Sequence, residues 1–120
     1  MTNVRSQPFS TPGPETTAVL ARLMEASFPG RNEVASQIAV ARVRPCDDDG
    51  CLEFERPDAP PAPVVRRIPV EAEAEEADGT TFHVLLHVVD GFINELERFR
   101  EDGHPIQGPI RPEALRLLEF

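Results

Sequence analysis

The residues with the clearest capacity for chemistry are two histidines four positions apart, His83 and His87. On a helix this spacing can bind zinc, and a glutamate directly after the first histidine would begin a protease signature. Val84 occupies that position, and the valine-rich stretch around it is typical of a strand. Four residues along a strand span about 13 Å. Two imidazoles that far apart cannot both reach one zinc ion at about 2 Å, so we interpret the histidines as solvated or ion-paired.

Acidic residues form the second group that could do chemistry. Glu71, Glu73 and Glu75 alternate with small residues before the histidines. Paired carboxylates support acid–base catalysis where a pocket raises one pKa, and an alternating strand face points at water instead. The acidic turn at Asp47–Gly50 lacks calcium-loop spacing, because Cys51 takes the fifth position. We therefore predict no catalytic residue, no metal ligand and no cofactor.

Asp-Gly pairs indicate the elements that position these groups. One ends the acidic turn at Gly50, and three more follow at a spacing of twelve residues: Asp78-Gly79, Asp90-Gly91 and Asp102-Gly103. Asp-Gly between β-branched and aromatic runs is a strong hairpin signal, and such runs cover Thr81–Val89 and Phe92–Arg100. If Ala72 is to share an apolar face with Val84, the loop at Gly79 must contain an odd number of residues. We predict a three-residue turn with Gly79 in the left-handed conformation.

Helical periodicity is confined to the two ends of the chain. Pro14 is suited to begin a first helix, Asn32 to cap a second, and Pro112 to begin a short third one. The sequence therefore predicts an α+β fold, with N-terminal helices packed on an antiparallel meander of about five strands and a short C-terminal helix. We expect a flexible arm over 1–13 and one domain over 14–120. The predicted core is Leu20, Leu23, Phe28, Val43, Leu52, Phe54, Val84, Leu86, Val88 and Leu96.

Composition excludes several classes of function. The net charge of −9 would repel a phosphate backbone, and a chain without Trp or Tyr has few side chains for base stacking, so we expect no nucleic-acid partner. No apolar run is long enough to span a membrane, and the N-terminus lacks a signal core, so we expect a cytoplasmic protein. Cys46 and Cys51 are then expected to be reduced thiols, although oxidation could bridge them.

The chain carries a "VDG" turn at Val89-Asp90-Gly91, followed by an "ELExxRxDG" pattern that ends at Asp102-Gly103. The segment from His83 to Gly103 resembles a segment of small uncharacterised bacterial proteins, many from GC-rich actinobacteria, and "ARVRP" and "PVEAEAEEADG" look similar too. The resemblance implies a shared fold more than a shared activity. Some small proteins of this kind sit beside secreted toxins as immunity proteins, which suggests a direction for function but assigns no residue a role.

The acidic strand face is the feature that best predicts function. With strict alternation, Ile93 and Phe99 share a face with Glu95 and Glu97. Mixed acidic and apolar surface suits capture of a basic protein, so we expect a non-catalytic immunity-type inhibitor that occludes a bacterial toxin. The alternatives are a small metal-dependent or acid–base enzyme that uses His83, His87 and nearby glutamates, and a structural homodimer. The predicted partner-binding residues are Glu71, Glu73, Glu75, Leu85, Ile93, Glu95, Glu97 and Phe99.

Overall fold

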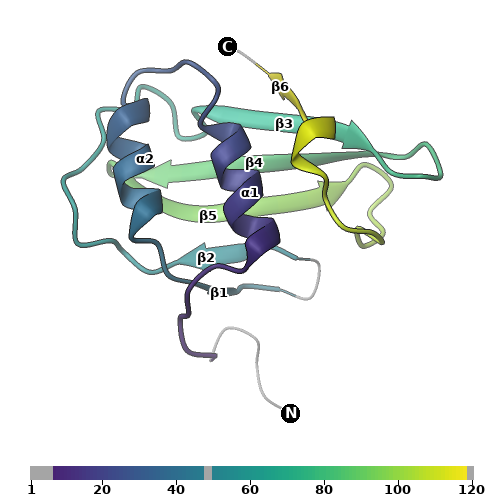
Figure 1. Ribbon diagram of the computed structural model, residues 1–120, viewed down its shortest axis with the longest axis horizontal. Helices are drawn as coiled ribbons and strands as arrows, with labels where there is room; N and C mark the ends of the chain where they lie inside the picture. The colour runs from purple at the N-terminus through teal and green to yellow at the C-terminus, as the bar shows by residue number, and fades with distance from the viewer. Residues whose placement is uncertain (1–6, 48–49, 119–120) are drawn as a thin grey trace.

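The structure is a computed structural model that describes residues 7–47 and 50–118. Two helices, α1 (Pro14–Leu23) and α2 (Arg31–Ala39), precede the sheet. The helices and the short 3₁₀-helix η2 (Pro112–Ala114) lie on one face of the sheet (Figure 1). The predicted α+β class is confirmed, with six strands rather than about five: β1 (Val43–Pro45), β2 (Leu52–Phe54), β3 (Val70–Glu75), β4 (Thr81–Val89), β5 (Phe92–Arg100) and β6 (Arg116–Leu118).

All neighbouring strands are antiparallel, in the order β1-β2-β5-β4-β3-β6. The sixth strand replaces most of the predicted C-terminal helix. Pro112 does begin a helical turn, but the turn lasts three residues and the backbone is extended again at Leu115. The chain then pairs with β3, placing Arg116 opposite Glu73. Strand pairing wins here because the edge of β3 would otherwise expose its backbone groups.

The β3–β4 hairpin has the predicted register. Ala72 lies opposite Val84, and Glu73 lies opposite His83. The Gly79 N–H donates to the Glu76 carbonyl at 2.8 Å, and Gly79 has a φ of 87°. The three-residue turn with a left-handed glycine is therefore confirmed, and the glutamates of β3 share a face with the histidines of β4.

The β4–β5 hairpin contains a β-bulge that the sequence analysis did not predict. Val88 lies opposite Ile93, whereas the residue before it in β4, His87, lies opposite Glu95. Asn94 is thus an extra residue, and it reverses the alternation of β5. Ile93 is only 2% exposed and belongs to the core. The prediction that Ile93 is a partner-binding residue is therefore wrong, because strict alternation does not hold through the bulge.

The core fills the space between the helices and the sheet. Eight of the ten predicted core residues are buried; Phe28 and Leu52 are half-buried and pack against the cluster. One buried residue of α2 is polar. The Gln37 amide donates to the carbonyls of Pro60 (2.9 Å) and Gly91 (2.8 Å) and accepts from the Ile93 N–H (2.9 Å). It fixes α2 to the turn of the β4–β5 hairpin.

The β1 edge of the sheet is paired with residues of the predicted N-terminal arm. Ser10 exchanges two backbone hydrogen bonds with Val43, each 2.8 Å long. The Arg44 guanidinium lies 4.2 Å from the centre of the Phe9 ring. The first six residues of the arm lie outside the described residues.

Candidate functional site

One face of the sheet is not covered by any helix of the described chain (Figure 1). We call this surface the open face and define it by the strand residues that the register places there. It contains every predicted partner-binding residue except Ile93. Its members are Arg44, Glu53, Glu71, Glu73, Glu75, Thr81, His83, Leu85, His87, Val89, Phe92, Glu95, Glu97, Phe99, Arg116 and Leu118.

Carboxylates dominate the charge of the open face. Its strand residues include six glutamates but two arginines. Arg44 bonds Glu53 at 3.1 Å, at one side of the face. At the other side, Arg116 hydrogen-bonds Glu75 and thereby lowers the pKa of that carboxyl. Among the strand residues of the face, four more glutamates than arginines therefore remain, and the Arg67 guanidinium, from the segment before β3, reaches the face only at His87.

Apolar and aromatic side chains lie among these carboxylates. Leu85 sits between Glu71 and Glu97 in the cross-strand register. The Phe99 ring stacks on the His83 ring, with 5.0 Å between centroids and 22° between planes. Phe99 is 40% exposed. An exposed aromatic ring beside a leucine and several carboxylates is suited to contact a partner that is both apolar and basic.

The two histidines do not form a joint site. They lie four residues apart on the same side of β4, with Leu85 between them on that side, as predicted. His83 Nε2 lies 2.8 Å from Glu101 Oε1, and His87 Nε2 lies 2.8 Å from Glu97 Oε1. In the described residues, neither ring bonds to a serine, threonine or cysteine side chain. Each histidine therefore pairs with a different glutamate.

Two cysteines join the open face at the turn of the β1–β2 hairpin, which the sequence analysis did not foresee. The Cys46 N–H donates to the Cys51 carbonyl at 3.1 Å, so the two residues face each other. Their sulfurs and a Glu95 carboxylate oxygen lie within 4.8 Å of one another. Burial raises the pKa of Cys51 to about 12, and the nearby Asp47 adds to the effect. The sequence shows that Cys46 and Cys51 flank an acidic turn, but it does not show that Glu95 of β5 lies beside them.

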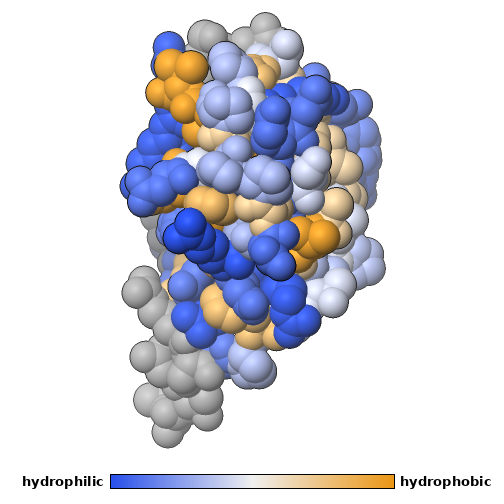
Figure 2. All heavy atoms as spheres, turned by 90° about the vertical axis from the view of Figure 1, so that its left-hand side faces the viewer, coloured by the Kyte–Doolittle hydropathy of each residue, from blue (hydrophilic) through white to orange (hydrophobic). Residues whose placement is uncertain are grey.

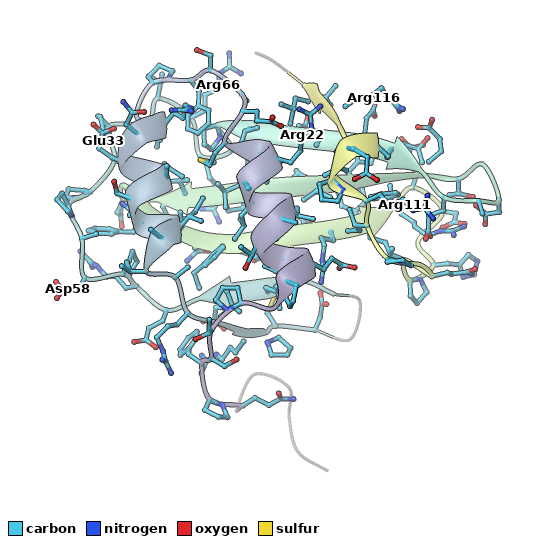
Figure 3. The ribbon with its side chains drawn as sticks, in the orientation of Figure 1. Arg22, Glu33, Asp58, Arg66, Arg111 and Arg116 are labelled. Atoms are coloured by element: carbon cyan, nitrogen blue, oxygen red, sulfur yellow. The ribbon has the colours of Figure 1, made fainter. Side chains whose placement is uncertain are left out.

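A buried arginine at the end of β5 lies on the face of the sheet that the helices cover, and it holds together a cluster of carboxylates. Arg100 is 4% exposed and bonds Glu76 (2.9 Å), Asp78 (2.9 Å) and Asp102 (2.6 Å). Two of these partners are the aspartates of the Asp78-Gly79 and Asp102-Gly103 turns, which lie at the same end of the sheet and meet at one guanidinium. A depression of about 640 Å³ lies beside this cluster and is lined in part by Arg111 (Figure 3). We interpret the Arg100 cluster as structural, because each of its three carboxylates bonds the buried guanidinium.

Comparisons with protein-family models, with curated proteins and with solved structures return no match. Within the described residues, no helix has the length and apolar character needed to cross a lipid bilayer. Function must therefore be inferred from the geometry of the open face.

Proposed function

We propose that the protein is a non-catalytic binding protein that captures a basic protein on the open face, and more specifically an immunity-type inhibitor that occludes a bacterial toxin. The observation that carries the proposal is the mixture of unbalanced carboxylates with exposed apolar groups on one uncovered sheet surface. Phe99 and Leu85 supply apolar contact there, and Glu71 and Glu97 flank Leu85. The net charge of −9 would attract a basic partner and speed its encounter.

The side of the molecule formed by α2 and the segment between β2 and β3 offers a weaker alternative. Figure 2 shows this side, where hydrophobic residues form small patches within a mostly hydrophilic surface. Val40 and Val65 are the exposed large hydrophobic residues besides Phe99 in the described chain, at 58% and 79% exposure. Exposed hydrophobic residues that occur singly are ordinary in soluble proteins.

The first experiment is capture of the partner by the tagged full-length chain in its native cell, followed by identification by mass spectrometry. A stoichiometric basic protein that dissociates at high salt is the expected result. The immunity proposal further requires that this partner be toxic when it is expressed alone and harmless when the two are co-expressed. A non-toxic partner would contradict the immunity proposal while leaving the binding function in place.

Substitutions then test whether the open face makes the contact. Glu71→Lys should weaken binding of the purified partner at least about tenfold at low salt, because like charges oppose docking. Phe99→Ala should weaken binding at all salt concentrations. Glu33→Lys is the matched control, since Glu33 lies on the exposed surface of α2 (Figure 3). Unchanged affinity in both open-face variants would refute the interface.

The homodimer alternative gives a different result. The protein would be recovered without another chain and with twice its expected mass in solution. Phe99→Arg would then restore the monomer, because a buried charge at the centre of an interface is costly. That outcome would replace the proposed partner with a second copy of the chain.

A further inference from the structure

Two thiols and one carboxylate converge at the β1–β2–β5 end of the open face. Cys46 follows β1, Cys51 precedes β2, and Glu95 lies on β5, opposite Glu53 of β2. The ligand atoms of the three residues lie within 4.8 Å of one another. Donors that bind one zinc ion at about 2.0–2.3 Å are roughly 3–4 Å apart in a tetrahedral site. Side-chain rotations that move the ligand atoms by about 1 Å would therefore bring all three within bonding distance of one zinc ion.

We propose that Cys46, Cys51 and Glu95 bind a thiophilic divalent cation of the Zn²⁺ type. Two thiolates and a carboxylate form a donor set that zinc accepts and that Mg²⁺ or Ca²⁺ does not favour. The two cysteines are separated by four residues, as in many pairs of zinc-binding cysteines. On binding, each thiol releases its proton to solvent, and the cation neutralises the resulting thiolates.

The charge around Glu95 supports a cation at this position. The neighbouring Glu53 is held by Arg44 at 3.1 Å. The Glu95 carboxylate, in contrast, has no hydrogen-bond or ion-pair partner among the described residues. A cation bound by the two thiolates would give that carboxylate a bonding partner, and the three-ligand site would keep one negative charge.

His87 does not complete this site. His87, Glu95 and Glu97 form a second group with ligand atoms within 4.8 Å of one another, so Glu95 belongs to both groups. In the sheet order, β4 lies three strands from β1, or about 14 Å, so His87 and Cys46 cannot share an ion. The Arg67 guanidinium also lies 3.4 Å from His87 Nδ1 and would repel a cation there. The group formed by Cys46, Cys51 and Glu95 is therefore the favoured cation site, and a water molecule would take the fourth coordination position.

The test uses Co²⁺ as a probe in a titration of the full-length protein, kept reduced by a phosphine. The expected result is one Co²⁺ per chain, with tetrahedral d–d absorption and thiolate-to-cobalt charge-transfer bands, both lost when Zn²⁺ displaces Co²⁺. Cys46→Ser should lower the charge-transfer intensity and weaken Co²⁺ binding at least about tenfold, because loss of even an outer-sphere partner has an effect of that size. Glu95→Gln should weaken binding similarly but keep the charge-transfer bands. Cys46 is half-buried, so its serine variant is expected to fold.

Glu71→Gln is the matched control, because it removes a carboxylate from the same face at β3 and should leave Co²⁺ binding unchanged. A spectrum without charge-transfer bands, from protein whose two thiols titrate as free, would overturn the inference. So would equal affinity in the wild type and Cys46→Ser, or a Cys46–Cys51 disulfide that persists in the reductant. These outcomes are independent of partner capture, which is tested at Glu71 and Phe99.

Discussion

Replacement of Gln37 by leucine should destabilise the protein by an amount that the structure lets us calculate. Gln37 is fully buried, and it bonds the Ile93 N–H and the carbonyls of Pro60 and Gly91. The Gly91 carbonyl keeps a second donor, the Ala62 N–H at 2.7 Å, so the substitution leaves two backbone groups without a partner. Each such group costs about 1–3 kcal/mol, or about 2–6 kcal/mol together. Extra apolar burial offsets about 1 kcal/mol, so we expect a net loss of about 1–5 kcal/mol.

The assay is urea denaturation followed by far-ultraviolet circular dichroism, since a chain without Trp or Tyr gives little intrinsic fluorescence. Ser36→Ala is the control on the same helix: the Ser36 hydroxyl is exposed and bonds only the Asn32 carbonyl one turn away. Its stability should lie within about 0.5 kcal/mol of the wild type. A Gln37→Leu protein as stable as the Ser36→Ala protein would refute the reasoning, because the two orphaned groups would then have found other partners or water.

Two further predictions concern the Asp-Gly turns. Hydrogen bonds from Arg100 lower the pKa of Asp102 from 3.8 to about 2. Between these two pH values, Asp102 binds fewer protons in the folded state than in the unfolded state. Its contribution to stability is therefore present above pH 3.8 and is lost as the pH falls to about 2. The midpoint of thermal unfolding of Asp102→Asn should accordingly depend less on pH in that window. Gly79→Ala should cost about 1–2 kcal/mol for its left-handed backbone alone. Gly91→Ala should cost more, because the added Cβ would also lie 2.8 Å from Pro61 Cβ, and equal losses in denaturation would contradict this account.

The hairpins could be predicted because their information is local. An Asp-Gly pair fixes a turn, and alternation on each side fixes which residues share a face. The parity argument at Gly79 needed only the apolar rows of β3 and β4, and the observed register agrees with it. The same reasoning placed Glu71, Glu73 and Leu85 on one surface. Apolar periodicity likewise identified most of the core.

The features that the sequence did not reveal depend on contacts between distant segments. The Gln37 amide serves a strand 56 residues away, and a glutamine at a helical position carries no sign of that role. Arg100 gathers carboxylates from two turns and from the strand end at Glu76. The meeting of Cys46 with Glu95 depends on the pairing of β2 with β5, which are far apart in the chain. Local patterns are silent on such pairings.

The bulge at Asn94 links this long-range structure to the proposed function. Without the extra residue, the register of the Asp90-Gly91 turn would continue, and Glu95 and Glu97 would face the helices opposite Leu86 and Val84. Burying two carboxylates against an apolar core is far more costly than a bulge. The bulge instead buries Leu96 and turns both glutamates to the open face. Gln37 supports this register, because β2 pairs with β5 only at Glu95 and Leu96, leaving the Ile93 N–H to the Gln37 side chain. The same buried amide that stabilises the fold therefore also helps to decide which charges a partner or a cation can reach.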